Sequence, residues 1–277
     1  MFFFKLRTFV GFVAGFLFSL VPTKERKIAD LQLKKFLASK NPSPIIRKMY
    51  TSLGQSFMES LNFSPLLAES EKFIHCSDID KVERWLSQKR GIVCLTAHTG
   101  NWDLLAAYMI KKGAQLTVIG KQAKNNFVQK FIENLRSKYG AKIIWRADKK
   151  AAAEIIKELT GNRVVAGLID QDTRVTSVMS LFLGAPAKTP STLISLAQKT
   201  NALIVYAFIV RTGFITFEII VNEIDATLKV EEILANYHKA LGDVIINHPS
   251  QWVWFHKRWR TMENGKTLSS KEYIRSF

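Results

Sequence analysis

Cysteines, acidic residues and repeated segments are all scarce in this 277-residue chain. The two cysteines, Cys76 and Cys94, give no disulfide framework, and Cys94 stands in an apolar run where a packing role is expected. No internal repeat, low-complexity tract or long linker divides the sequence, so it offers no second domain boundary. A hydrophobic content of 47% is typical of a folded protein, and we expect one sizeable domain with an N-terminal appendage.

Acidic residues are outnumbered by basic ones, with 23 Asp and Glu against 40 Lys and Arg and a formal net charge of +17. The excess is concentrated in residues 1–50, where ten basic residues face only Glu25 and Asp30. A patch of this kind attracts either nucleic acid or an anionic membrane. The sequence beside the patch has to distinguish these two partners.

That neighbouring sequence, residues 8–21, carries no charge and is rich in phenylalanine. Its fourteen residues are short for a membrane-spanning helix, which needs about 20. Residues 1–4 would lengthen the apolar segment if Lys5 and Arg7 extended their charged ends towards water. The length therefore allows either a short span or a helix that lies in the membrane interface.

Two alternatives compete with a membrane anchor, namely a cleaved signal peptide and a helix of the protein core. Residues 21–23, Val-Pro-Thr, lack the small residues of a cleavage site, and a dense basic cluster follows them. We therefore predict a membrane-anchoring helix over residues 1–22. Because more positive charge follows this helix than precedes it, residues 23–277 are expected on the cytoplasmic side.

Beyond the predicted anchor, patterns typical of strands and helices alternate along the chain. Strands are predicted over residues 91–97, 115–119, 141–145 and 163–169, with helices over 104–110, 125–138 and 149–159 between them. Further helices are predicted over 43–61, 78–89, 190–199 and 229–247, and a hairpin of strands over 203–210 and 214–221. The alternation predicts an α/β fold around a largely parallel sheet.

A histidine ends the first predicted strand, and a carboxylate begins the helix after it. His98 and Asp103 are five positions apart, so in a continuous helix they would point away from each other at about 100° per residue. They can meet only if His98 lies in the turn and Asp103 in the first helical turn. A histidine held by a carboxylate is a natural general base. The alternative is structural: Asn101 caps the helix, Asp103 favours its dipole, and His98 is an ordinary loop residue.

The segment 95–103, Leu-Thr-Ala-His-Thr-Gly-Asn-Trp-Asp, resembles the His-x4-Asp/Glu signature of the bacterial lipid A late acyltransferases. These lauroyl and myristoyl transferases belong to the lysophospholipid and glycerolipid acyltransferase superfamily. Three further stretches match in the expected order: basic residues 121–136, residues 167–172 with 182–190, and the tryptophan-rich residues 249–259. The resemblance therefore extends from residue 1 to about residue 262.

The resemblance implies a helix-flanked, largely parallel sheet and a membrane-associated acyltransferase at the cytoplasmic face of the inner membrane. The implied reaction moves a fatty acyl chain from acyl carrier protein to a hydroxyl of a Kdo-substituted lipid A precursor. His98 would be the general base and Asp103 would fix its tautomer, without a protein nucleophile. No cofactor is expected, and no metal, because Asp170 and Asp172 lack a third ligand nearby.

Two other functions stay open at this point. The first is acylation of a different glycolipid or a phospholipid, with acyl-CoA as donor. The second is a basic nucleic-acid-binding protein, against which the apolar N-terminus and the His98 motif argue.

The same resemblance assigns substrate-binding residues. Lys121 and Arg136 suit phosphate groups on a lipid head or a carrier's prosthetic group, although both also fit a solvated helix face. Backbone N–H groups around Asn101 could stabilise an oxyanion. Asp170 and Gln171 belong to the site by the resemblance, at the end of a predicted strand. The remaining lysines of this helix are expected to be surface charges: Lys124, Lys130 and Lys138.

Residues 252–259 alternate so that Trp252, Trp254, His256 and Arg258 would share one face of an extended segment. Such a face also fits a nucleic-acid stacking platform or a membrane interface. The resemblance favours a part of the substrate site, with Arg258 binding substrate. The histidines without a partner pattern are expected to be surface or capping residues: His75, His238 and His248.

Overall fold

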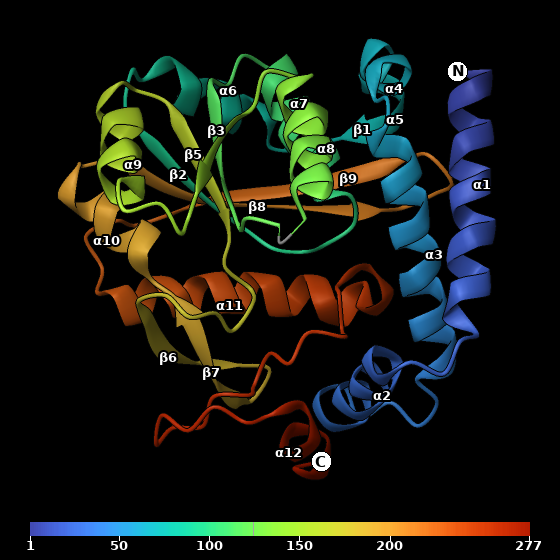
Figure 1. The fold of residues 1–277 in the computed structure, drawn as a ribbon. Coiled ribbons are helices and arrows are strands. Elements are labelled where there is room, and N and C mark those ends of the chain that lie inside the picture. Colours follow the sequence, from blue (N-terminus) through green and yellow to red (C-terminus); the bar gives the residue numbers. More distant parts are fainter. Residues whose placement is uncertain (124) are drawn as a thin grey trace.

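The computed structural model describes residues 1–123 and 125–277 (Figure 1). Lys124, predicted to be a surface charge, lies outside the described residues. Within the described part, a seven-stranded sheet forms the centre, in the order β1-β9-β8-β2-β5-β3-β4. Its strands are β1 (Ile74–His75), β2 (Ile92–Thr96), β3 (Leu116–Gly120), β4 (Lys142–Trp145), β5 (Val164–Leu168), β8 (Leu203–Arg211) and β9 (Phe217–Ile224).

Helices cover both faces of this sheet (Figure 1). On one side lie α6 (Ile79–Ser87), α7 (Trp102–Lys111) and α8 (Asn126–Ser137). Around the rest of the sheet the chain forms α9 (Ala151–Thr160), α10 (Thr192–Lys199) and α11 (Val230–Asn247). The N-terminal third contributes α1 (Phe2–Ser19), α2 (Lys24–Phe36), α3 (Ser43–Ser60), α4 (Ser64–Ala68) and α5 (Ser70–Phe73), and the C-terminal end contributes α12 (Ser270–Arg275).

The pairing confirms the predicted α/β fold with a largely parallel sheet. β2 pairs in parallel with β5 and with β8, and β3 pairs in parallel with β5 and with β4. The predicted hairpin is present as the antiparallel pair β8 and β9. Central strands β2 and β5 are apolar apart from Thr96 at the end of β2, as is usual for parallel strands with both faces covered.

No sequence pattern predicted the second, two-stranded sheet, which consists of β6 (Ser177–Phe182) and β7 (Ala185–Pro190). Leu183 and Gly184 both have positive φ, 47° and 80°, which is the type I′ geometry of a two-residue hairpin. Figure 1 shows this hairpin beyond α11, away from the main sheet. The predicted helix 190–199 accordingly begins two residues later, at Thr192.

The N-terminal helix α1 packs along α3 at the side of the molecule (Figure 1). Gly11 and Gly15 on α1 face Gly54 and Tyr50 on α3 so closely that a Cβ on Gly11 would lie 2.3 Å from the Gly54 carbonyl oxygen. The glycines therefore let the two backbones touch. By length and composition α1 could cross a membrane, and only 28% of the helix is buried. This observation favours membrane attachment and leaves the choice between a span and an interfacial helix open.

The α1–α3 contact generates a first prediction. A Cβ at Gly54 would lie 2.2 Å from the Gly11 carbonyl oxygen, so Gly54→Val forces the helices apart. We expect the free energy of unfolding in detergent to fall by about 1–3 kcal/mol, measured by denaturant titration. Gly242→Ala on α11 is the matched control, because its nearest neighbour is 3.6 Å away. If Gly54→Val were as stable as the wild type, the close packing of α1 on α3 would be refuted.

Candidate active site

The candidate site lies at the carboxyl ends of β2 and β5. These strands are parallel neighbours, and Thr96 at the end of β2 is paired with Leu168 at the end of β5. His98 and Asp170 each follow two residues later. In an open α/β sheet, residues at such strand ends converge on one crevice. The register therefore places an imidazole and a carboxylate side by side.

His98 and Asp170 form a hydrogen-bonded pair. Nδ1 of His98 lies 2.8 Å from Oδ1 of Asp170, and the backbone N–H of His98 donates to Oδ2 at 3.0 Å. The indole N–H of Trp252 donates to the same Oδ2 at 2.8 Å. Asp170 is fully buried, and burial alone would raise its pKa. The charge and hydrogen bonds of His98 instead hold the pKa of Asp170 well below its usual range, so this carboxylate stays ionised.

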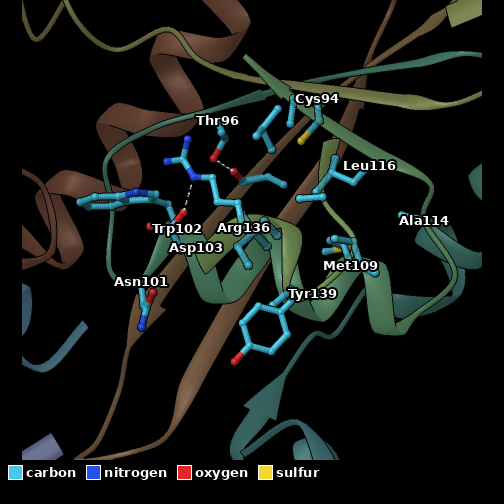
Figure 2. Close-up of a pocket in the computed structure, with 18 of the residues that line it drawn as sticks. Cys94, Thr96, Asn101, Trp102, Asp103, Met109, Ala114, Leu116, Arg136 and Tyr139 are labelled. Carbon is cyan, nitrogen blue, oxygen red and sulfur yellow. Dashed lines mark hydrogen bonds and ion pairs between the residues drawn. The ribbon is translucent and has the colours of Figure 1, made fainter. Parts of the chain in front are cut away.

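The prediction that Asp103 fixes the His98 tautomer is wrong. Oδ1 of Asp103 accepts a hydrogen bond from Nε of Arg136 at 3.1 Å, as the dashed line between them in Figure 2 shows. Asp103 sits in the first turn of α7 and faces α8, whereas the strand register brings Asp170 to the imidazole. Asp103 and Arg136 nevertheless line an apolar cavity together with Trp102, whose ring lies 5.0 Å from that of His98.

Asn101 holds the loop between β2 and α7. Its Oδ1 accepts from the backbone N–H of Leu104 at 3.1 Å, which is the N-cap predicted as the structural alternative. Its Nδ2 donates to buried Glu59 at 2.9 Å. The N–H groups of Thr99 and Gly100 are also engaged, with the carbonyl oxygens of Ala97 and Gln251, both at 2.8 Å. A substrate-binding side chain at Asn101, or an oxyanion site at these two N–H groups, therefore does not fit the structure.

Gln171 and His256 complete the polar surface around His98. Nε2 of Gln171 lies 3.0 and 3.1 Å from the two ring nitrogens of His98 and 2.6 Å from Nε2 of His256. The His98 and His256 rings are 5.3 Å apart, and the Trp102 ring lies 5.0 Å from that of His98. Burial, together with the charge of His98, lowers the pKa of His256 to about 4. His256 is thus neutral near pH 7 and can accept the Gln171 N–H.

An apolar cavity of about 500 Å³ reaches Trp102 (Figure 2), whose ring lies 5.0 Å from that of His98. It lies between the sheet and the helices α3, α6, α7 and α8. Asp103, Arg136 and Trp102 stand together at one part of its wall, and Met109 and Ala114 lie away from them in the view. Its apolar lining includes Leu53, Phe57, Trp85, Leu105, Met109, Phe131 and Leu135. Cys94 also lines the cavity, where burial raises the thiol pKa to about 12 and keeps the group neutral.

A wider cleft of about 1320 Å³ meets the site from the other side. His98, Gln171 and His256 lie in its wall, and Arg136 and Ile132 line both this cleft and the apolar cavity. The cleft is strongly basic, and its charged lining comprises Lys121, Arg136, Arg146, Lys149, Arg174, Lys257 and Arg260 with Asp148 and Asp172. Lys121 and Arg136 thus lie where a phosphate-bearing ligand could reach them.

The predicted substrate-binding role of Arg258 is wrong. Its side chain is completely buried and donates to the Lys188 carbonyl at 2.5 Å and to Oγ1 of Thr189 at 2.6 Å. Residues 254–259 form turns rather than the predicted extended segment, so alternate residues do not share a face. Arg258 therefore ties the C-terminal segment to β7, while the tryptophans around it are buried: Trp252, Trp254 and Trp259.

His238, expected at the surface, is instead buried beside Arg258. Its Nδ1–H donates to the Leu181 carbonyl oxygen at 3.1 Å, and its Nε2 accepts from Arg258 at 3.2 Å. Burial and the guanidinium charge lower the pKa of His238 to about 3. Nothing in its sequence neighbourhood marked this residue, because its partners come from distant segments.

No group of three or more His, Cys, Asp or Glu side chains suited to a metal ion occurs in the described part of the chain. Asp172 illustrates why, since its carboxylate accepts from the Thr261 N–H at 2.9 Å and lies 3.6 Å from Nε of Arg260. The expectation that the site needs no metal remains a prediction.

Comparisons with known proteins identify the family of the chain. A family model described as bacterial lipid A biosynthesis acyltransferase matches residues 4–261. The chain is 25% identical over 169 residues to the phosphatidylinositol mannoside acyltransferase of Mycobacterium tuberculosis, covering 58% of this chain and 52% of that protein. The protein of the same name from Mycolicibacterium smegmatis is 24% identical over 168 residues, covering 58% and 54%. The chain thus spans about half the length of the curated relatives it matches.

The buried His238 generates a prediction on stability. Its folded-state pKa of about 3 lies below the ordinary value of 6.5, so the unfolded chain takes up the proton first as the pH falls. Above pH 6.5 His238 is neutral in both states and does not lower the free energy of unfolding. As the pH falls from 6.5 towards 3, protonation of the unfolded chain lowers the free energy of unfolding. Between pH 7 and pH 5 this residue should cost about 2 kcal/mol of unfolding free energy.

The measurement is denaturant unfolding at several pH values. In His238→Gln the decline towards low pH should be shallower by this amount, whereas His75→Gln, at an exposed histidine, should leave the slope unchanged. Equal slopes for His238→Gln and the wild type would contradict the buried neutral histidine.

Proposed function

Because the chain belongs to the bacterial lipid A biosynthesis acyltransferase family, we propose that it moves a fatty acyl chain from a thioester donor to a hydroxyl of a glycolipid. One observation carries the proposal. His98, paired with Asp170, lies in the wall of a basic cleft, and Arg136 lines both this cleft and an apolar cavity. Acyl transfer between lipids needs a general base with room for a hydrocarbon chain on one side and for charged head groups on the other.

We infer a role for each member of the pair from its contacts. Asp170 accepts the Nδ1–H of His98, which leaves Nε2 as the basic nitrogen. Nε2 takes the proton of the acceptor hydroxyl while the oxygen attacks the thioester carbonyl carbon. A C–O bond forms and the C–S bond breaks as the tetrahedral intermediate collapses. The proton then passes from His98 to the leaving thiolate, and the ionised Asp170 stabilises the imidazolium in between.

The apolar cavity suits the acyl chain. A methylene group is about as large as a water molecule, whose share of liquid volume is about 30 Å³. At about 30 Å³ for each methylene, the cavity of about 500 Å³ has room for roughly 17 of them, which is enough for a long fatty acyl chain. Arg136 stands with Asp103 at its polar end and also lines the cleft that holds His98, so the thioester carbon would stand where the two spaces meet.

The basic cleft suits the phosphate groups of both substrates. We propose acyl carrier protein as the donor, with its prosthetic-group phosphate in this cleft, and a Kdo-substituted lipid A precursor as the acceptor. Family membership supports the acceptor. Lys121 and Arg136 are the predicted phosphate contacts, and the cleft adds further candidates: Arg146, Lys149, Arg174, Lys257 and Arg260.

We also propose that the enzyme works at the cytoplasmic face of the inner membrane. The apolar helix α1 and the basic residues that follow it support this location. The acceptor would then be reached from the membrane, and a carrier protein from the cytoplasm.

A second acceptor class has specific support. The curated relatives carry the name phosphatidylinositol mannoside acyltransferase, so a glycolipid other than lipid A, acylated from acyl-CoA, is the alternative. Mass spectrometry of total lipid A with and without the gene separates the two acceptors. Loss of one acyl chain from lipid A would support the first, and an unchanged profile would favour the second. Parallel assays of the purified protein with acyl carrier protein and CoA thioesters would identify the donor.

The mechanism predicts a ranked set of variants. His98→Ala should lower kcat by about a hundredfold to ten-thousandfold through loss of the general base. Asp170→Asn should also lower kcat at least about a hundredfold, because an amide no longer stabilises the imidazolium. Asp103→Asn is the matched control, since its partner is Arg136. It should mainly raise KM. The pKa that the pH dependence of kcat reports for the general base should stay unchanged.

Steady-state kinetics across pH would measure these effects, with circular dichroism as the check on folding. Near wild-type turnover in His98→Ala or Asp170→Asn would refute the mechanism. A shift of the kinetic pKa in Asp103→Asn, absent in Asp170→Asn, would return the role to Asp103.

A further inference from the structure

Large apolar side chains are exposed at the edge of the apolar cavity. Phe57 at the end of α3 is 57% exposed, and Phe127 and Val128 at the start of α8 are 79% and 44% exposed. Phe57 and Val128 also line the cavity itself. We call these three residues the cavity rim. Clustered exposed apolar side chains of this size mark a surface that contacts something other than water.

Helix α8 is a cover over the cavity. Its inner side contributes Val128, Phe131, Ile132, Leu135 and Arg136 to the lining, and none of its residues is buried. The inner side of α8 is therefore covered only when a ligand fills the cavity, and its outer side only when another surface lies against it. The Phe57 and Phe131 rings are 6.3 Å apart, so α3 and α8 meet at the rim.

The rim lies on the same side of the fold as the apolar helix α1. Figure 1 shows α3 between α1 and α8, and α1 packs directly on α3. The outward face of α1 exposes Phe2, Phe3, Leu6, Phe9, Val10, Phe12, Val13, Leu17 and Phe18. Lys130, on α8 two residues after Val128, is exposed and complements anionic lipid.

We propose that the cavity rim inserts into the interface of an anionic lipid bilayer, so that the acyl cavity opens to lipid instead of water. Exposed aromatic side chains next to a basic residue are the composition that such an interface favours. An acyl chain could then enter or leave the cavity beneath α8 without crossing the aqueous phase. The identity of the chain in the cavity rests on the proposed function, whereas insertion of the rim can be measured without it.

The test uses the full chain with Phe127→Trp and vesicles of phosphatidylethanolamine and phosphatidylglycerol with brominated acyl chains. Bromine quenches only a tryptophan that enters the bilayer, and the wild-type chain supplies the background of its six native tryptophans. The matched control is Leu181→Trp, which is 66% exposed on the hairpin beyond α11. We expect quenching of the Phe127→Trp signal and none of the Leu181→Trp signal.

A second measurement asks whether the rim adds affinity. Phe127→Asp should weaken partitioning into the same vesicles by about tenfold, and Leu181→Asp should leave it unchanged. Absence of quenching in the Phe127→Trp variant, with the chain still bound through α1, would overturn the proposal. Equal quenching at both positions, or equal partitioning of both Asp variants, would overturn it too.

The two proposals fail separately. Absence of acyl transfer to every acceptor, with the rim still quenched, would reject the proposed function and keep the membrane surface. Acyl transfer by a chain whose rim is not quenched would keep the proposed function and reject the membrane surface.

Discussion

The parallel pairing of β2 with β5 is the contact on which the candidate site depends. Its register sets Thr96 beside Leu168, so the chain leaves both strands at the same level and His98 meets Asp170. Asp170 is closed off from water and accepts three N–H groups, two from His98 and one from Trp252. A buried carboxylate that is satisfied in this way holds its charge and orients the imidazole. A shift of one residue in this register would turn one of the two side chains to the other face of the sheet.

The loop after β2 is held from several directions as well. Glu59 is buried on α3, accepts two hydrogen bonds from Arg211 at 2.7 and 2.9 Å, and receives the amide of Asn101. Gly100 has φ of +50° and lies so close to the Ile209 carbonyl that a Cβ would come within 2.4 Å of its oxygen. Thr8 of α1 donates to the same Glu59 at 3.2 Å. One polar network therefore joins the apolar N-terminal helix to the loop that carries His98, and this network fixes the position of that loop.

An apolar cavity and a basic cleft meet next to the loop that carries His98. The cavity beneath α8 is apolar, whereas the cleft on the other side gathers basic side chains, and Arg136 belongs to both. The ion pair of Arg136 with Asp103 places a charge at the point where the environments change. The proposed function uses this separation, with a hydrocarbon chain on the apolar side and a phosphate-bearing group on the basic side. It also explains why Asp103 belongs to the motif although it does not touch His98.

Local patterns in the sequence were sufficient for the α/β class, the hairpin of β8 and β9, the apolar α1 and the cap at Asn101, because periodicity, turn residues and caps act over a few positions. The family resemblance, and not a local pattern, placed Asp170 and Gln171 in the site with His98. The partner of His98 was decided by strand register between residues 72 positions apart, which no local pattern contains. The structural roles of Arg258 and His238 were likewise decided by their burial against β6 and β7. No local pattern predicted the I′ turn of this hairpin. Sequence thus determined the elements and the chemical groups, and tertiary packing decided which groups meet, because long-range register and burial depend on the whole sheet.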